Sequence, residues 1–258
     1  MQVHILASGS TGNVAFFKFG HTQLLVDVGI SARSIENKLA QIGVNAGNLD
    51  GVLITHEHID HIKGLDVFIR RYHLPVFARA ATWEAIACRH KLPAECCITI
   101  EDEFSIGKVG VAAYSISHDA ADPVGFAFYF RDQKWVIATD IGVITKSVLQ
   151  ALNGADLVVL EANHDRDMLK NGPYPRFLKQ RIMGKYGHLS NDEAAAVLAK
   201  IGCRNKMQVF LAHLSQKNNL PGLALKTVND HLQQKGVALG KDIKISLTYP
   251  DTIMSFTG

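Results

Sequence analysis

Cysteine is scarce in this chain of 258 residues, which contains only Cys88, Cys96, Cys97 and Cys203. Two of the four are adjacent, and none has the paired spacing of a thiolate zinc site. This pattern excludes a closed structural metal site built from thiolates. We therefore expect reduced, mostly buried thiols, as in a cytosolic protein.

Long apolar runs and a strong net charge are missing as well. No uncharged apolar segment approaches the roughly 20 residues that cross a membrane, and residues 1–6 do not resemble a signal peptide. The 27 basic and 24 acidic residues nearly balance, so the net charge of +3 indicates no particular partner. Together these absences predict a cytoplasmic protein without a membrane segment.

Strand-like apolar runs come close together at first and later alternate with helix-like segments. This order predicts an α/β (α+β) fold, namely an αββα sandwich of two mixed sheets flanked by helices. The predicted strands are Val3–Ala7, Gln23–Val28, Gly51–Thr55, Val76–Ala78, Val109–Ile116, Val124–Phe130, Lys134–Thr139, Asp156–Leu160, Gln208–Ala212 and Ile243–Thr248. The predicted helices are Ser31–Ile42, Ile62–Tyr72, Ala80–Lys91, Thr145–Leu152, Asn191–Ile201 and Leu220–Lys235. Since no repeat or linker divides the chain, one domain is expected over residues 1–258.

One stretch, from Asp165 to Gly187, has no clean strand pattern. It has six basic residues against two carboxylates, with Tyr174, Phe177 and Tyr186 among them. Two interpretations stay open. The stretch is a solvated helical excursion over the surface, or it is a substrate arm whose cations meet phosphates while a ring stacks on a base.

The most informative motif is Thr55-His56-Glu57-His58-Ile59-Asp60-His61, which follows the apolar run Gly51–Ile54 directly. Such a run predicts a buried strand that presents the motif at its exposed carboxyl end. Imidazole and carboxylate ligands together suit zinc, iron or manganese. His56 and His58 form one pair and Asp60 and His61 follow, so the motif has ligands for two metal ions.

The pattern His56-x-His58-x-Asp60-His61 resembles the signature of the metallo-β-lactamase superfamily, whose fold is two sheets between helices. Its companions occur in the order of that superfamily, and they are Asp27, His118, Asp140 and His213. The resemblance implies two divalent ions (Zn, Mn or Fe). The resemblance assigns one ion to His56, His58 and His118 and the other to Asp60, His61 and His213. It places Asp140 between the two ions. Asp27 is expected to support the ligand turn.

Two divalent ions bridged by an aspartate and a water-derived oxygen supply hydroxide at neutral pH, for attack on a phosphate or a carbonyl ester. A general acid for the leaving group would distinguish the two, and His188 oriented by Glu161 is the candidate. Glu161 closes a predicted strand, and His188 precedes a helix start marked by the capping-box spacing of Ser190 and Glu193. This pair resembles one in the ribonuclease Z and β-CASP nucleases, which implies Asp60, His188 and Glu161 as the catalytic residues.

Weaker signals lie near these motifs. His164 and Asn163 follow Glu161 and are candidates for contact with substrate phosphate or for support of the ligands. The loop Ser8–Asn13, with Ser10 at its centre, lacks the Gly-Lys-Ser/Thr of a Walker motif. It is a tight turn between strands, or it binds a phosphate or braces the metal ligands.

Within the superfamily, the motifs around Ser8, Glu161 and His188 look most like those of the bacterial YycJ/WalJ-type group. This implies a metal-dependent phosphodiesterase, an exonuclease on single-stranded DNA, with RNA as the other nucleic acid to consider. Only 73 positions separate Asp140 from His213, too few for the domain that clamps RNA in β-CASP enzymes. Two alternatives are a thiolesterase or lactonase that uses the same ions, and a nucleic-acid-binding regulator with a structural metal site.

Overall fold

The computed structural model describes residues 1–202 and 206–258, so Cys203 lies outside the described residues. The chain forms two compact units. The first contains residues 1–113, 120–124 and 249–258, and the second contains residues 114–119 and 125–248. The expectation of one domain over the whole chain stays a prediction. In the described ranges, every helix is too short or too polar to cross a membrane.

The first sheet has seven strands in the order β14-β1-β2-β3-β4-β5-β6. They are β1 (Gln2–Ala7), β2 (Val14–Phe19), β3 (Thr22–Val26), β4 (Gly51–Leu53), β5 (Val76–Ala78), β6 (Cys97–Thr99) and β14 (Met254–Thr257). Strands β1 to β3 pair antiparallel, whereas β3 to β6 run parallel. The carboxyl ends of β3 and β4 therefore meet at one edge, where Asp27 and Thr55 follow.

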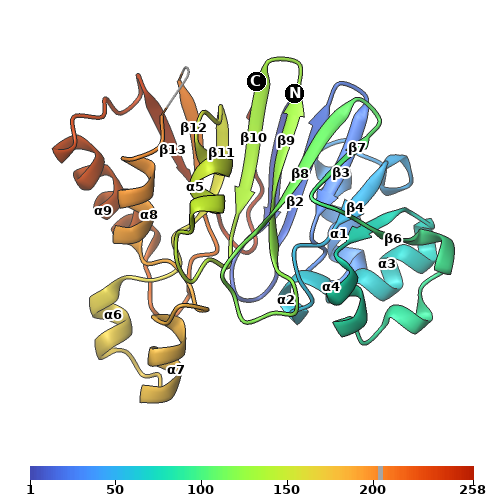
Figure 1. Cartoon of the computed structure of the whole chain (residues 1–258), viewed down its shortest axis with the longest axis horizontal. Helices are drawn as coiled ribbons and strands as arrows, with labels where there is room; N and C mark the ends of the chain where they lie inside the picture. The colour runs from blue at the N-terminus through green and yellow to red at the C-terminus, as the bar shows by residue number, and fades with distance from the viewer. Residues whose placement is uncertain (203–205) are drawn as a thin grey trace. The chain divides into compact units, whose positions relative to one another are not determined.

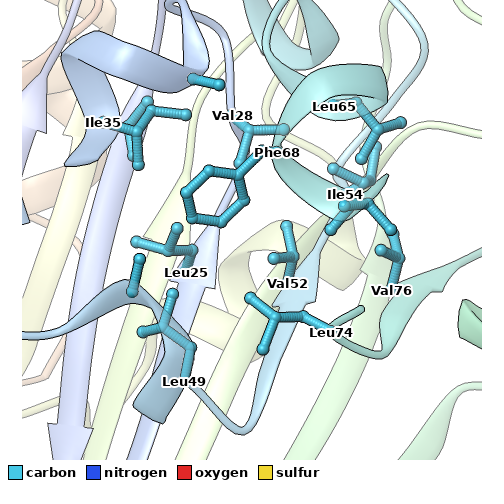
Figure 2. Close-up of a cluster of buried hydrophobic side chains, with 14 of the residues drawn as sticks. Leu25, Val28, Ile35, Leu49, Val52, Ile54, Leu65, Phe68, Leu74 and Val76 are labelled. Atoms are coloured by element: carbon cyan, nitrogen blue, oxygen red, sulfur yellow. The ribbon is translucent and has the colours of Figure 1, made fainter. Parts of the chain in front are cut away.

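The helices of the first unit bury apolar side chains against this sheet to different extents. They are α1 (Ala32–Gln41), α2 (Ile59–Ile62), α3 (Leu65–Tyr72) and α4 (Ala80–Ala85), with 3-10 turns η1 (Ala46–Asn48), η2 (Arg89–Lys91) and η3 (Ala94–Cys96). Ile35 of α1 and Phe68 of α3 join Leu25, Val52 and Val76 of the sheet in a fully buried cluster (Figure 2). This packing fixes the position of the carboxyl ends of β3 and β4 relative to the helices α1 and α3.

The second sheet has the order β13-β12-β11-β10-β9-β8-β7. Its strands are β7 (Glu103–Ile106), β8 (Val109–Ser115), β9 (Val124–Phe130), β10 (Gln133–Ala138), β11 (Leu157–Glu161), β12 (Met207–Ala212) and β13 (Ile243–Leu247). Strands β10 to β13 pair parallel, and every residue of β11 and β12 is buried, as is typical of parallel strands covered on both faces. Asp140, Glu161 and His213 therefore lie at the carboxyl edge of three neighbouring strands.

The described part of the second unit contains five helices: α5 (Lys146–Leu152), α6 (Arg166–Asn171), α7 (Arg176–Ile182), α8 (Asn191–Leu198) and α9 (Pro221–Gln234). The predicted capping box at the start of α8 is confirmed, with reciprocal hydrogen bonds between Ser190 and Glu193. The predicted excursion of residues 165–187 contains α6 and α7 and no strand. It lies beyond the carboxyl end of β11 (Figure 1).

Several predicted boundaries were wrong for identifiable reasons. Strand β3 ends at Val26, before the predicted Val28, because Asp27 has a φ of +60° and leaves the strand conformation. The helix predicted from Ile62 begins at Ile59, and Gly64 divides it into α2 and α3. Strand β2 was not predicted, although its buried apolar run is of the kind from which other strands were predicted.

Other differences concern short elements and thiols. Strands β6, β7 and β14 were also missed, and each has only three or four residues. The helix predicted over Ala80–Lys91 is broken into α4 and η2. The three cysteines in the described part of the chain are free, as expected, but only Cys96 is buried. Cys88 and Cys97 have intermediate exposure and pack against the core of the first unit.

Candidate metal centre

Three candidate residues occupy a left-handed backbone conformation at strand ends. Asp27 and Asp140 have φ of 60° and His213 has φ of 56°, three of the five non-glycine residues with positive φ in the described chain. This conformation costs on the order of 1–3 kcal/mol per residue and persists only where the surroundings impose it. The left-handed conformation thus coincides with three candidate residues, at the ends of β3, β10 and β12.

In the first unit, the Asp27 carboxylate organises the ligand motif. His61 Nδ1 donates to Asp27 Oδ2 over 2.8 Å, and the Thr55 backbone N–H and hydroxyl also donate to this carboxylate. The Thr55 hydroxyl lies 3.0 Å from His56 Nδ1 and accepts its proton. With both Nδ1 protons held in this way, Nε2 of His56 and Nε2 of His61 carry lone pairs.

The Asp27 side chain is buried, and hydrogen bonds occupy its carboxylate. Burial raises its pKa, and the charge and hydrogen bond of His61, with the hydrogen bonds of Thr55, act in the opposite direction. Both oxygens already accept hydrogen bonds from these residues. This geometry agrees with the expectation that Asp27 supports the ligand turn.

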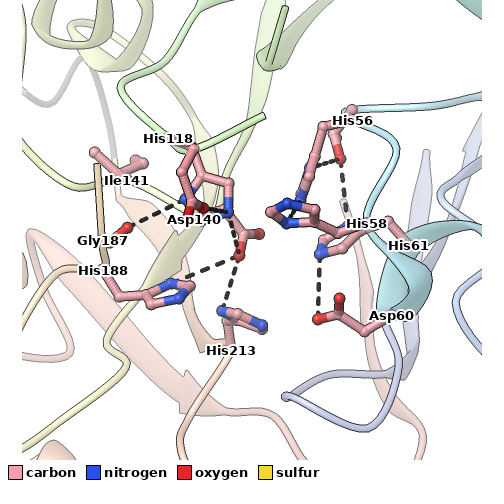
Figure 3. Close-up of polar contacts among 12 residues, drawn as sticks. His56, His58, Asp60, His61, His118, Asp140, Ile141, Gly187, His188 and His213 are labelled. Atoms are coloured by element: carbon pink, nitrogen blue, oxygen red, sulfur yellow. Dashed lines mark hydrogen bonds and ion pairs between the residues drawn. The ribbon is translucent and has the colours of Figure 1, made fainter. Parts of the chain in front are cut away.

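The donor atoms of the motif have the separations that a divalent ion requires. His56 Nε2 lies 3.1 Å from His58 Nδ1 (Figure 3). Two nitrogens bound to one tetrahedral zinc at about 2.0–2.1 Å lie about 3.3 Å apart. Asp60 Oδ2 lies 3.6 Å from His61 Nε2 and forms a second pair of donors. The residues present therefore fit divalent metal ions.

The loop Ser8–Asn13 braces this motif through Asn13. The Asn13 backbone N–H donates to Asp60 O over 2.8 Å, and its side-chain Nδ2 lies 3.3 Å from His61 Nε2 and 3.5 Å from Asp60 Oδ2. Ser10, named from the sequence, is exposed. Of the interpretations of this loop, the contacts favour bracing, and the residue responsible was not singled out in advance.

In the second unit, the Glu161 carboxylate is fully buried and accepts four hydrogen bonds. Its Oε1 accepts from Nδ1 of His188 over 2.8 Å and from Nδ1 of His213 over 2.9 Å. Its Oε2 accepts from the backbone N–H groups of Ile141 and Leu189. Burial raises the pKa of Glu161, but the charges and hydrogen bonds of the two imidazoles outweigh it and leave the pKa far below its usual range.

Asp140 lies among three imidazoles of the same unit (Figure 3). Its Oδ1 is 3.4 Å from His213 Nδ1, 3.6 Å from His188 Nδ1 and 3.9 Å from His118 Nε2. His118 Nδ1 donates to Gly187 O, which directs Nε2 away from that carbonyl. Burial lowers the pKa of His118 and Asp140 raises it, with a net decrease that favours the neutral, metal-binding form.

Asp140, Glu161, His188 and His213 each offer a donor atom within 4.8 Å of the others. We exclude Glu161 as a ligand, because hydrogen bonds already satisfy both of its oxygens. Its link to His188 was predicted, whereas its link to the ligand candidate His213 was not. A carboxylate behind a metal-binding imidazole is a common supporting arrangement and was the available signal.

The weaker candidates of this unit have different positions. Asn163 Nδ2 donates to His213 O over 2.8 Å and supports the strained backbone there. Asn219, not predicted, donates to the carbonyls of Ala162 and Asn163. The His164 side chain is buried, and its Nδ1 has no hydrogen-bond partner within the described residues. Burial lowers the pKa of His164, and its role stays a prediction.

Known proteins resemble this chain over nearly its whole length. A family model described as beta-lactamase superfamily domain matches residues 22–214, which include every candidate ligand. Exodeoxyribonuclease YycJ of Bacillus anthracis is 38% identical over 255 residues, covering 97% of this chain and 96% of that protein. Exodeoxyribonuclease WalJ of Streptococcus pneumoniae is 37% identical over 260 residues, covering 98% and 96%.

A solved structure shows the same fold. The metallo-beta-lactamase fold protein YhfI from Bacillus subtilis superimposes with a TM-score of 0.70 at 15% sequence identity, covering 98% of both chains. The two seven-stranded mixed sheets with flanking helices agree with this fold. The predicted fold class and the resemblance stated from the motifs are confirmed.

Proposed function

Since this chain belongs to the beta-lactamase superfamily domain family and is a metal-dependent hydrolase, we propose that it is an exonuclease that cleaves phosphodiester bonds of single-stranded DNA. The observation that carries the proposal is the 2.8 Å hydrogen bond between His188 Nδ1 and the buried Glu161 carboxylate. The names of the two exodeoxyribonuclease relatives support the same substrate class.

The proposed metal centre consists of two divalent ions, as the order of the family motif implies. One ion is assigned to His56, His58 and His118, the other to Asp60, His61 and His213, with Asp140 shared. When bound, such ions lower the pKa of a coordinated water from 15.7 toward about 7 and neutralise charge on the phosphate. Zinc, manganese and iron all suit these ligands.

His188 is the proposed general acid. Because its Nδ1 proton is held by Glu161, its Nε2 is the atom that transfers a proton to the departing oxygen. Burial lowers the pKa of His188, but the Glu161 charge and hydrogen bond, with the Asp140 charge, raise it above its usual value. An alkoxide leaving group requires such a proton, whereas a thiolate leaves without one. The pair therefore favours a phosphodiester over a thioester.

The test is digestion of end-labelled oligonucleotides by the metal-reconstituted protein. Single-stranded DNA, duplex DNA and RNA are compared, with bis(p-nitrophenyl) phosphate and a thioester as small substrates. We expect shortening of single-stranded DNA from one end, turnover of the phosphate diester, and loss of both with a chelator. Hydrolysis of the thioester with every oligonucleotide left intact would reject the proposal.

A further inference from the structure

The segment Asp165–Gly187, called the arm below, differs in charge from the rest of the chain. It has six basic and two acidic residues and thus a net charge of +4, whereas the whole chain has +3. All other residues together therefore have a net charge of −1. The positive charge of the protein is concentrated in the arm, which favours a polyanionic partner there.

The arm also exposes large apolar side chains. Phe177 is 72% exposed, Tyr186 54% and Met183 52%, and Phe177 is the most exposed large hydrophobic side chain in the described part of the chain. Helix α7 buries none of its side chains. Exposed rings that gather in one short segment are typical of a binding surface.

Part of the positive charge of the arm is available to a ligand. Arg181 is paired with Asp119 and Arg166 with Glu193, so these two guanidinium groups have partners. Lys170 and Arg176 are exposed and form no ion pair within the described residues. The Lys185 ammonium lies 5.3 Å from the centre of the Tyr186 ring, which places a cation beside an exposed aromatic face.

The end of the arm is fixed to the candidate site of the second unit. Arg181 donates from Nε and Nη2 to Asp119, the neighbour of His118. The Ser117 hydroxyl donates to Lys185 O over 2.7 Å, and His118 Nδ1 donates to Gly187 O. His188 follows directly. The end of the arm therefore directly precedes the proposed general acid in the chain. DNA bound on the arm would lie near that residue.

We propose that the arm is the binding site for single-stranded DNA, in which Phe177 and Tyr186 stack on unpaired bases. Lys170, Arg176 and Lys185 contact the phosphates on either side. This inference rests on the proposed function and assigns the strand-binding residues of the same enzyme. Stacking requires bases that are not paired, so the rings select a single strand over a duplex.

The experiment measures two quantities on the same variants. One is the KM for a single-stranded DNA of about 12 nucleotides, a length in the range of single-strand sites. The other is turnover of bis(p-nitrophenyl) phosphate, which has no strand to bind. Phe177→Ala and Tyr186→Ala are each expected to raise the KM about 10-fold, and the pair Lys170→Glu with Arg176→Glu to raise it further. Turnover of the small diester is expected to stay within about twofold, because these side chains are exposed.

Matched controls are Tyr129→Ala, an exposed ring on β9, and Lys235→Glu with Lys241→Glu, exposed cations outside the arm. The inference is overturned if the arm variants keep the wild-type KM. It is also overturned if the control variants raise the KM as much as the arm variants do. If Phe177→Ala and Tyr186→Ala raise the KM for duplex DNA as much as the KM for single-stranded DNA, the stacking role is wrong. Self-association of the wild type that Phe177→Ala abolishes, without a change in KM, reassigns the surface to a second copy.

Fluorescence anisotropy of the labelled strand, with divalent metal removed, separates the two proposals. In one outcome the wild type binds the DNA strand, the arm variants do not bind it, and no protein degrades it. The proposal for the arm is then correct and the exonuclease proposal fails. If the wild type degrades the strand and the variants bind it normally, the exonuclease stands and the arm is wrong. If the wild type neither binds nor degrades it, both are wrong.

Discussion

Carboxylates in the candidate site are hydrogen-bonded to imidazoles in pairs. Asp27 holds His61, and Glu161 holds both His188 and His213. In each pair the carboxylate fixes the Nδ1 proton and leaves Nε2 for other chemistry. Glu161 thus connects a proposed metal ligand with the proposed general acid through one buried group.

The general acid is tested by His188→Ala. We expect hydrolysis of single-stranded DNA to fall by about 10²–10⁴-fold, because an alkoxide then leaves without a proton. Turnover of bis(p-nitrophenyl) phosphate should change far less, since p-nitrophenolate is a good leaving group. Metal content by elemental analysis should be unchanged. His231→Ala, on α9, is the control, and a His188→Ala variant with full DNA activity would contradict the assignment.

The support given by Asp27 is tested by Asp27→Asn. The substitution removes the negative charge behind His61, and loss of such a group typically weakens metal binding by about 10–100-fold. Competition with a chromogenic chelator measures the affinity. Asp50→Asn is a matched control in the same unit, because Asp50 also accepts a backbone hydrogen bond, from Gln23, but is distant from the motif in the fold. Equal affinities in Asp27→Asn and the wild type would refute this role.

At the scale of elements, the short helix α2 depends on close contact with two loops. The Val28 N–H donates to His61 O, and Asn13 N–H donates to Asp60 O. A Cβ on Gly29 would lie 1.7 Å from Asp60 O, so only glycine permits this approach. The position of the ligands in α2 is therefore set by backbone contacts as well as by the sequence of the motif.

Gly29→Ala tests this contact. The added methyl group must displace Asp60, and we expect a loss of stability of about 1–3 kcal/mol together with weaker metal binding. Urea denaturation and metal titration measure the two effects. Gly222→Ala is the control, because a Cβ there meets no atom within 4 Å. Wild-type stability and metal affinity in Gly29→Ala would show that the contact is unimportant.

At the scale of the whole molecule, the proposed ligands are divided between the two units. The first unit contains the ligand motif, and the second contains His118, Asp140 and His213. Ions that bind only the folded chain stabilise it by mass action, by about 2.7 kcal/mol at a free concentration 100 times Kd. Metal binding and global stability are therefore linked in this proposal.

Two variants test the division of ligands, His61→Ala in the first unit and His213→Ala in the second. Each is expected to lower the bound metal from two ions per chain to one, because the proposal assigns both residues to the same ion. A chelator should lower the Tm of the wild type more than that of either variant. Two retained ions in either variant, or no effect of chelation on the wild-type Tm, would contradict the proposed ligand assignment.

The candidate ligands and the candidate general acid were identified from the sequence alone. An apolar run that is followed by His56, Asp140 or His213 predicts a strand end, although all three side chains are buried in the structure. The capping box of Ser190 and Glu193 was equally readable, because its hydrogen bonds are local. The order of these motifs was sufficient for the fold class and the family.

Only the tertiary structure shows which backbone groups hold the candidate residues in position. Glu161 is fixed by backbone N–H groups of Ile141 and Leu189, and the arm by the carbonyl of Gly187. Any residue type supplies these backbone atoms, so the sequence has no signal for them. The Asn13 backbone N–H donates to Asp60 O across 47 positions, and the sequence has no signal for this contact either. Such contacts exist only once the sheets have brought distant segments together.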